Sequence, residues 1–460
     1  MPGYDSATTA RDRRELEQAA SMASSKACQR VSFEAVHRFN PVLMAARFRL
    51  ANGLRIVLMP DRRAAVFAFQ TWFCVGSKHE DPGLTGIAHL FEHLMFKGTH
   101  AHPPGAFDRE MERRGSQTNA ATWVDWTYYT EALAARSDNL ETVVGFEVDR
   151  MTNLILDEAT FRSELEVVKN ERRMMVDDSV TGALSELLYA TAYTEHPYRW
   201  PTIGSMQHLE AATPGELERF YRTYYAPNNA TLVLVGALDP IDTLTLLAKS
   251  YGPLPPQSIP APPDIVEPKQ EAAKLVLMER PVVAPQMMIA FHAPAQGDPR
   301  HAQLEMLSEI LTAGDNARLY RRLVTDDRLA TELVGYVSPF AEPGLYEIVV
   351  TARPGAEPER IIDAVQQEVE RVCREPLSIA EVDKARNGLE LALLEGLGSV
   401  EGCAEALGHF ETTRDDFSEA FAGPAAWADA TPDDLMRAAA SIFRPENRTT
   451  VAALPAGKVA

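Results

Sequence analysis

Short apolar runs near the start of each half of the chain follow the same order. Residues 54–60 form the first run and 65–75 the second, and the pair 274–279 and 286–292 repeats this arrangement. Short apolar segments bounded by polar residues are typical of β-strands. The pattern therefore predicts two matching pairs of strands, one in each half.

An amphipathic pattern follows each strand pair. It begins near Gly86 in the first half and near Arg300 in the second, and it predicts a helix in both places. A further apolar strand is predicted late in each half, at 230–236 and at 449–453. Strands interleaved with helices on a repeated plan predict an α+β fold of two homologous halves. Each half is expected to contain duplicated α/β units, with mixed or antiparallel sheets flanked by helices.

A proline-rich segment, 253–268, separates the halves. Prolines at this density interrupt both helix and sheet, so the segment is predicted to be an extended linker. It divides the chain into an N-terminal half, 31–252, and a C-terminal half, 269–460. Residues 1–30 mix alanine, serine and charged residues and are predicted to form a disordered leader. The prolines that define the linker are Pro253, Pro255, Pro256, Pro260, Pro262, Pro263 and Pro268.

Composition and charge narrow the classes of function. The 460 residues exceed what one ordinary core holds, so at least two domains are expected. Lys and Arg number 45 against 65 Asp and Glu, and the net charge of −20 argues against a nucleic-acid partner. No apolar run reaches the ~18 residues of a membrane span. Residues 1–30 lack the apolar stretch of a signal peptide, and periplasm and cytoplasm stay open as alternatives.

The segment 85–99 (TGIAHLFEHLMFKGT) carries the clearest chemical signal. His89 and His93 lie four residues apart on the predicted helix, so both imidazoles project from one face. Two histidines one turn apart are a common pair of zinc ligands. Glu92 faces the same ion without ligating it, which suits a general base that accepts a proton from water. The four cysteines are scattered without C-x-x-C spacing and are predicted to be buried or idle thiols.

A catalytic zinc ion usually has three protein ligands, so a carboxylate is expected from another helix. The helical pattern that begins at Phe161 places Leu165 and Val168 on the same side. Glu164 and Glu171 lie seven residues apart and share a face beside this apolar stripe. Burial of a carboxylate there costs free energy unless the group is paired or bound to a cation. The alternative is that the glutamates lie on a solvated edge of the helix. Spacing alone does not distinguish between the two glutamates as the ligand.

The stretch 76–99 (GSKHEDPGLTGIAHLFEHLMFKGT) resembles the metal-site region of the pitrilysin/insulinase family of zinc peptidases, with its inverted His-x-x-Glu-His motif. The similarity is greatest to the bacterial and mitochondrial processing-peptidase branch. It continues at 115–133, 161–175, 196–205 and 220–236. The resemblance implies a clamshell metallopeptidase fold with one zinc ion per chain. It also implies a bacterial endopeptidase that hydrolyses peptides or unfolded segments.

The resemblance also assigns residues to roles. In that family the third zinc ligand lies on a helix well past the second histidine, and the separation 171 − 93 = 78 implies Glu171. Glu164 then matches an acidic residue that helps to orient the site. Asn119 and Ala120 match an edge strand that binds substrate by backbone pairing, although an ordinary tight turn and strand start is the alternative.

The second half departs from the family pattern. Members that work alone carry an Arg and a Tyr seven residues apart, which contact the substrate carbonyl. Alignment through 314–323 places Val324 and Thr331 at these positions. Arg328 and Tyr336 lie nearby but are eight residues apart. The pair is therefore predicted to be absent.

This departure predicts a partner. In the processing-peptidase branch a homologous sister subunit supplies the Arg and Tyr, so the resemblance implies that this chain is the zinc-bearing subunit of a heterodimer. The alternatives are a self-sufficient homodimeric peptidase and a non-catalytic structural subunit. The complete set of zinc-site residues argues against the structural subunit. The second-half helix at 301–311 has no histidine pair and is predicted to bind no second zinc.

Overall fold

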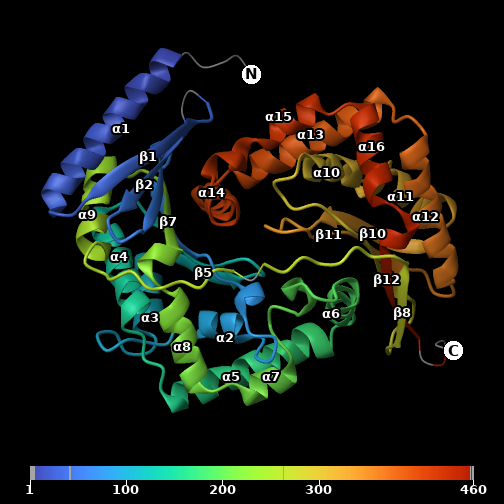
Figure 1. The fold of residues 1–460 in the computed structure, drawn as a ribbon, viewed down its shortest axis with the longest axis horizontal. Helices are drawn as coiled ribbons and strands as arrows, with labels where there is room; N and C mark the ends of the chain where they lie inside the picture. The colour runs from blue at the N-terminus through green and yellow to red at the C-terminus, as the bar shows by residue number, and fades with distance from the viewer. Residues whose placement is uncertain (1–5, 41–42, 263, 456, 458–460) are drawn as a thin grey trace. The chain divides into compact units, whose positions relative to one another are not determined.

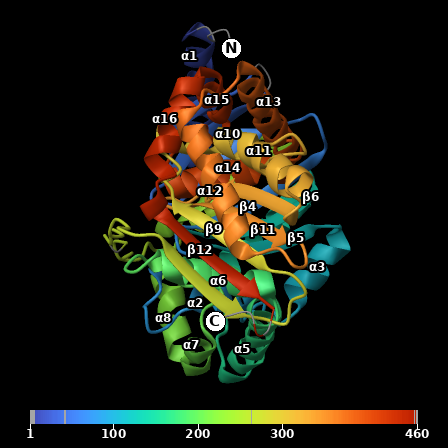
Figure 2. The same ribbon diagram turned by 90° about the vertical axis from the view of Figure 1, so that its right-hand side faces the viewer.

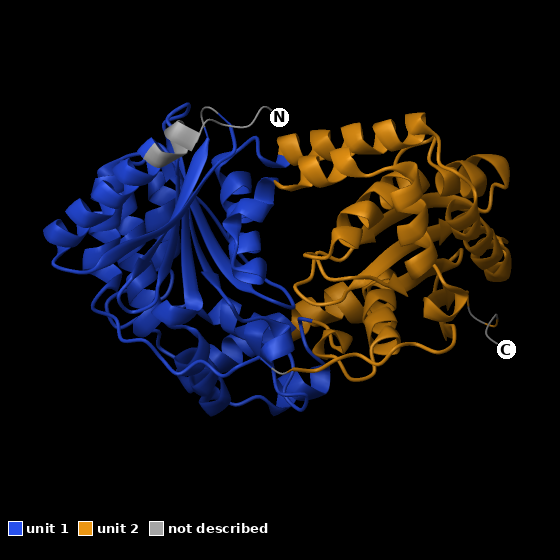
Figure 3. Ribbon diagram, turned by 45° about the horizontal axis from the view of Figure 1, so that its top comes forward, with its two compact units in different colours: residues 1–168, 202–263, 396–421 blue, residues 169–201, 264–395, 422–460 orange. Residues whose placement is uncertain are grey.

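The computed structural model describes residues 6–40, 43–262, 264–455 and 457 (Figure 1). Contacts within the chain divide it into two compact units (Figure 3). Unit 1 consists of Met1–Val168, Thr202–Pro263 and Gly396–Phe421, and unit 2 consists of Lys169–Pro201, Asp264–Glu395 and Ala422–Ala460.

Unit 1 is built on a seven-stranded mixed sheet with the order β1-β2-β3-β7-β4-β6-β5. Only β3 and β7 run parallel, and the other neighbours are antiparallel. The strands are β1 (Val31–Arg38), β2 (Met44–Leu50), β3 (Arg55–Pro60), β4 (Val66–Phe73), β5 (Gln117–Thr122), β6 (Thr127–Ala134) and β7 (Ala230–Gly236).

Unit 2 is built on a five-stranded mixed sheet with the order β10-β11-β9-β12-β8, much of which is visible in Figure 2. Only β8 and β12 run parallel. The strands are β8 (Lys274–Glu279), β9 (Gln286–His292), β10 (Ala330–Val337), β11 (Leu345–Ala352) and β12 (Arg448–Leu454).

The two sheets confirm the predicted repeat. The order β3-β7-β4-β6-β5 in unit 1 corresponds strand by strand to β8-β12-β9-β11-β10 in unit 2, with the parallel pair in the same place. The six strands predicted from apolar runs are β3, β4 and β7 in the first half and β8, β9 and β12 in the second. The edge strands β1 and β2 have no counterpart among the described residues of the second half.

Alternation along the central strands of unit 1 shows that both faces of the sheet are buried. Ile56 and Leu58 point into the larger core, whereas Val57 and Met59 between them point into a smaller core on the opposite face. This period-two pattern follows from the pleat of a strand. The helices of unit 1 are α1 (Ser6–Ala27), α2 (Ile87–Leu94), α3 (Ala106–Arg114), α4 (Ser137–Thr152), α5 (Glu158–Arg172), α7 (Met206–Ala211), α8 (Pro214–Tyr224), α9 (Pro240–Tyr251) and α14 (Val400–Arg414).

The main core of unit 2 lies between its sheet and the helices that follow β9 and β11. Met287, Ile289 and Phe291 of β9 pack there with Leu304 and Leu307 of α10. The helices of unit 2 are α6 (Val180–Ala192), α10 (Pro299–Thr312), α11 (Arg318–Tyr320), α12 (Pro358–Arg374), α13 (Ile379–Gly396), α15 (Gly423–Asp429) and α16 (Pro432–Ile442).

One helix from each half packs on the sheet of the other half. Helix α14, from the second half of the sequence, contacts β4 and β7 and belongs to unit 1. Helix α6, from the first half, contacts β9 and β12 and belongs to unit 2. The units therefore differ from the sequential halves 31–252 and 269–460, because each sheet needs a helix to cover its second apolar face.

The prediction that residues 1–30 form a disordered leader is wrong for the described part of that segment. Residues 6–27 form helix α1, in which Leu16, Ala20 and Ala23 are buried and pack into the main core of unit 1. Helix α1 also contacts α9. The alanines and serines that suggested disorder are small residues that allow close helix packing, which residue composition alone did not show.

Between α9 and β8 the described residues from 255 to 273 form neither helix nor strand, and one of the points where the chain passes from unit 1 to unit 2 falls at 263–264. The four cysteines are all free thiols, and Cys403 is the buried one. No helix in the described ranges is long and apolar enough to cross a membrane.

Candidate metal centre

Helix α2 carries the predicted motif. It starts after Gly86, whose φ of 95° is a left-handed conformation that glycine adopts without strain. Leu90, Phe91 and Leu94 bury one side of the helix in the core of unit 1. The apolar spacing thus orients the helix and leaves the side with His89 and His93 less buried.

Three side chains converge at this helix. One ligand atom each from His89, His93 and Glu171 lie within 4.8 Å of one another, the one such group of three in the described part of the chain. The two imidazole rings lie 4.9 Å apart, centroid to centroid. Two imidazole nitrogens and one carboxylate oxygen form a donor set that suits a catalytic zinc ion with an open fourth position. The residues present therefore fit the group that the motif predicts.

Helix α5 supplies the carboxylate. Phe161 and Val168 bury its inner side and Leu165 is partly buried, as the sequence pattern predicts. The boundary between the units passes between Val168 and Lys169, but α5 is one continuous helix. Glu164 and Glu171 therefore keep the relation that two turns of one helix impose, with Glu164 buried and Glu171 half-buried.

Glu164 contacts the second histidine rather than joining the ligand group. Its Oε2 lies 3.6 Å from Nδ1 of His93, and its Oε1 lies 2.6 Å from Nζ of Lys97. A ligating histidine usually directs its second ring nitrogen toward a carboxylate, which fixes the orientation of the ring. This geometry leaves Nε2 of His93 for an ion. Lys97 was not predicted, although its spacing of four residues from His93 is a possible signal.

Glu92 is buried and held by a residue of the neighbouring sheet. The hydroxyl of Thr122, at the end of β5, donates to Oε2 of Glu92 at 2.6 Å. This bond restricts the carboxyl group on the helix face shared with the histidines. Thr122 was not predicted either, because thirty residues separate it from Glu92 and no local spacing connects them.

Asn119 and Ala120 lie on β5, which is the outer strand of the seven-stranded sheet. Asn119 is opposite Thr130 and Ala120 is opposite Tyr129 on β6. Because β5 has one neighbouring strand in the sheet, its outer backbone edge faces no further strand of that sheet. Helix α2 also contacts β5, so this edge lies beside the metal-site helix.

The second-half positions expected for an Arg and a Tyr have other roles. Val324 packs against the main core of unit 2, and the hydroxyl of Thr331 donates to the carbonyl oxygen of Thr351 at 3.2 Å. The nearby Tyr336 donates to Glu347 at 2.8 Å. His301, on the corresponding helix α10, is buried, with Nε2 3.3 Å from the carbonyl oxygen of Ser338.

Comparison with known sequences defines the class of protein. Residues 55–205 match the sequence profile of the insulinase family (peptidase family M16), and 211–389 match the profile described as the M16 inactive domain. The chain belongs to peptidase family M16, the pitrilysin/insulinase family. The first profile contains His89, His93 and Glu171, the three residues whose donor atoms converge.

Individual relatives support this membership. The chain is 28% identical to a Helicobacter pylori protein named zinc protease PqqE, over 87% of this chain and 91% of the relative. A crystal structure described as a protease from Helicobacter pylori superposes with a TM-score of 0.86 at 27% identity, covering 90% of this chain and 100% of that one. A probable mitochondrial-processing peptidase β subunit of Arabidopsis thaliana is 23% identical, over 80% of this chain and 71% of the relative.

Proposed function

We propose that this chain is a zinc-dependent endopeptidase whose metal ion is held by His89, His93 and Glu171, one ion per chain. The observation that carries the proposal is the convergence of these three donor atoms within 4.8 Å beside a buried Glu92. Relatives named zinc proteases support the reaction class. A structural role alone requires none of these side chains, so the set favours a peptidase over a non-catalytic subunit.

Each residue around the proposed zinc ion has a separate role in peptide hydrolysis. Zinc, when bound, supplies a Lewis acid that polarises the scissile carbonyl and acidifies a water molecule. Glu92 accepts the proton of the attacking water and then delivers it to the leaving nitrogen. Thr122 holds the Glu92 carboxyl group in place at 2.6 Å. Glu164 orients the ring of His93 through Nδ1, and Lys97 in turn holds the carboxylate of Glu164.

An extended peptide fits the outer edge of β5. Addition of a strand pairs the backbone of Asn119 and Ala120 with that of the substrate, and such pairing selects an extended conformation rather than a short side-chain motif. The substrates are therefore peptides or unfolded segments. Helix α2 contacts this strand, which brings the paired peptide near the candidate metal site.

A sister subunit completes the site in this proposal. The side chains at 324 and 331 are valine and threonine, so neither supplies a cationic or phenolic donor for a developing oxyanion. A homologous chain with an Arg and a Tyr at these positions would supply both donors. The similarity to a mitochondrial-processing peptidase β subunit agrees with a division between two subunits. A self-sufficient homodimer is the alternative.

Cleavage of a quenched fluorescent peptide tests the proposal. The purified chain is assayed alone and with a homologous sister chain that carries the Arg and Tyr. Each arm is run with zinc, with a chelator and with Glu92→Gln. We expect cleavage only when both chains are present. The chelator should abolish this cleavage, and Glu92→Gln should lower it at least about 10³-fold.

The other outcomes separate the alternatives. Full activity of the chain alone would favour the homodimer and overturn the need for a sister subunit. No cleavage in any arm, despite zinc binding, would favour the structural subunit.

A further inference from the structure

Helix α2 depends on its surroundings for its orientation. It has eight residues, about two turns, and helices of this length are unstable in isolation. All residues of the zinc-site motif lie on it, so a small rotation of α2 moves both imidazoles and the Glu92 carboxyl group together. The contacts at its first turn therefore decide where these groups point.

A buried glutamate binds that first turn. Glu80 follows the short helical turn η1 (Ser77–His79), and its Oε2 accepts the backbone N–H of Gly86 at 2.9 Å. Its Oε1 accepts the N–H of Ala88 at 2.8 Å. The first N–H groups of a helix have no partner within the helix, so the two oxygens satisfy donors that would otherwise be buried without a bond. Glu80 itself is buried.

The backbone before α2 is held from a second direction. A Cβ atom on Gly204, which has a φ of 76°, would lie 2.3 Å from the carbonyl oxygen of Thr85. A Cβ atom on Gly86 would lie 2.6 Å from the carbonyl oxygen of Ile203. The absence of a side chain at both glycines thus allows the two backbone segments to come into contact. The hydroxyl of Thr85 also accepts the N–H of Ser205 at 3.2 Å.

The segment before Glu80 is bound to the turn that joins β5 and β6. The N–H groups of Ser77 and Lys78 donate to the carbonyl oxygens of Trp123 and Val124, both at 3.0 Å. Nζ of Lys78 lies 2.7 Å from Asp125, which is buried. The segment 76–80 therefore connects the turn next to Thr122 with the start of α2.

We propose that Glu80 is a positioning residue, which sets the direction of α2 relative to β5 and so aims the zinc-site side chains. The inference rests on the proposed function for the identity of the ion. It does not require Glu80 to touch the metal or the substrate. The loop at Gly204 touches the backbone before α2, whereas Glu80 binds N–H groups at the start of the helix directly. The contacts of Ser77 and Lys78 with the β5–β6 turn hold the segment that carries Glu80.

The ionisation of Glu80 indicates which substitution is conservative. Burial raises the pKa of Glu80 to about 8, although the N–H donors of α2 act in the opposite direction. A largely neutral carboxyl group near pH 7 resembles glutamine in charge and shape. Glutamine keeps one accepting oxygen but turns an NH₂ group toward the second N–H. Alanine removes both acceptors.

The test compares Glu80→Ala and Glu80→Gln with Asp239→Asn. Asp239 is a matched control, since its carboxylate accepts two backbone N–H groups at the start of α9, at 3.0 and 3.1 Å. Hydrogen exchange of the metal-free protein reports the protection of α2, and competition with a chromogenic chelator reports zinc affinity. We expect Glu80→Ala to accelerate exchange of residues 86–94 and to weaken zinc binding by about tenfold or more.

We expect the change in hydrogen exchange of 86–94 and in zinc affinity to be large for Glu80→Ala and smaller for Glu80→Gln. Asp239→Asn should leave the exchange of α2 unchanged. If Glu80→Ala does not fold, Glu80→Gln carries the test, because it keeps the shape of the side chain. Unchanged exchange of 86–94 in a folded variant would overturn the inference. Absence of zinc binding by the wild-type protein would overturn the proposed function, while the exchange comparison still decides the role of Glu80.

Discussion

The sheets of the two units have the same strand order but carry different chemistry. In unit 1 the helix after β4 is α2, with His89, Glu92 and His93, whereas in unit 2 the helix after β9 is α10, with the single His301. The backbone plan is common to both, since each has one parallel pair at the same place. The shared topology therefore does not by itself determine whether this helix carries the His-x-x-Glu-His motif.

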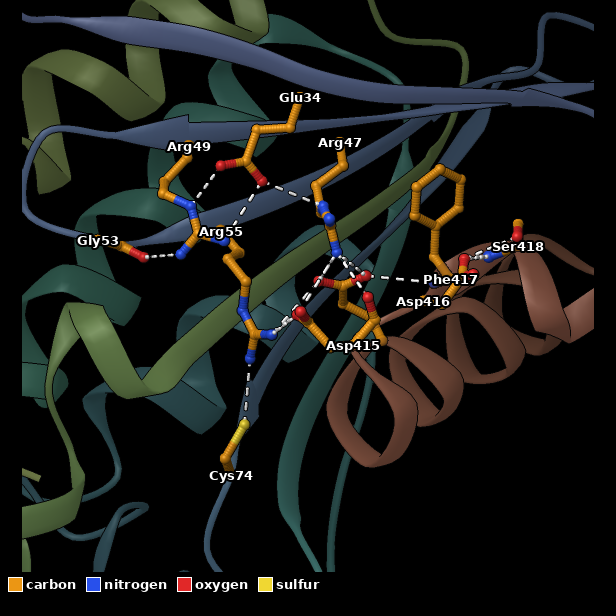
Figure 4. A network of polar contacts seen from close by, with 11 residues as sticks. Glu34, Arg47, Arg49, Gly53, Arg55, Cys74, Asp415, Asp416, Phe417 and Ser418 are labelled. Atoms are coloured by element: carbon orange, nitrogen blue, oxygen red, sulfur yellow. Dashed lines mark hydrogen bonds and ion pairs between the residues drawn. The ribbon is translucent and has the colours of Figure 1, made fainter. Parts of the chain in front are cut away.

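The helices exchanged between the halves show the same contrast. On unit 1, Glu411 of α14 is fully buried and accepts from Arg47 at 3.0 Å, and Arg55 lies 3.4 Å away. Both guanidinium groups also contact Asp415 (Figure 4). On unit 2, Tyr189 of α6 donates to the buried Glu347 at 2.6 Å. The exchanged helix thus accepts from arginines of β2 and β3 in unit 1, whereas in unit 2 it donates from a neutral hydroxyl to a glutamate of β11.

The largest expected effect is on zinc content, when a variant in α2 is compared with a variant in α10. His93→Ala removes one of the three proposed zinc ligands and should abolish stoichiometric zinc binding, whereas His301→Gln in α10 should leave the proposed one zinc ion per chain. Metal content after dialysis, measured by atomic spectroscopy, provides the comparison. Loss of zinc in His301→Gln, with the fold intact, would mean that α10 contributes to zinc binding.

The next effect concerns the ionic contact of α14. Glu411→Ala leaves Arg55 with the exposed Asp415 as its acidic partner and Arg47 with Asp415 and Glu34. Because both guanidinium groups are largely buried, the change should lower the free energy of unfolding by about 3 kcal/mol. Glu419→Ala, at the end of the same region, breaks a more exposed pair with Arg414 and should cost less than about 1 kcal/mol. Urea denaturation measures both. Equal costs would contradict the role of burial.

The smallest effect is the pH dependence that Glu347 contributes to unit 2. Burial raises the pKa of Glu347 above its ordinary value of 4.5, although Tyr189 and Tyr336 donate to it. A raised folded-state pKa gives stability that is complete below about pH 4.5 and is lost as the pH rises through the folded-state pKa. The stability advantage of wild type over Glu347→Gln, measured by urea denaturation, should therefore shrink as the pH rises from 4.5 to 8. An advantage that grows with pH would contradict this sign.

Some parts of the site followed from local sequence and others did not. The four-residue spacing of His89 and His93 placed both on one face of a helix, because helical geometry is local. Spacing left Glu164 and Glu171 equivalent, and the fold separates them, since Glu164 contacts Lys97 while Glu171 joins the donor group. That distinction depends on which turn of α5 lies beside α2.

The sequence pattern did not identify the residues that hold the site in place. Thr122 bonds Glu92 across thirty positions, and this contact exists because β5 is the outer strand beside α2. No local spacing marks Glu80, and its burial and its bonds to Gly86 and Ala88 arise only in the folded chain. Composition likewise suggested disorder for residues 6–27, which pack as a helix.

The sequence by itself determined the strands β3, β4 and β7, their repeat in the second half, and the helix with its histidine pair. These features rest on periods of two and 3.6 residues, which a short stretch of chain expresses without help from the rest. Only the tertiary structure decided that α6 and α14 each cover the sheet of the other half. The physical reason is that an apolar helix face shows that it must be buried, but not against which sheet.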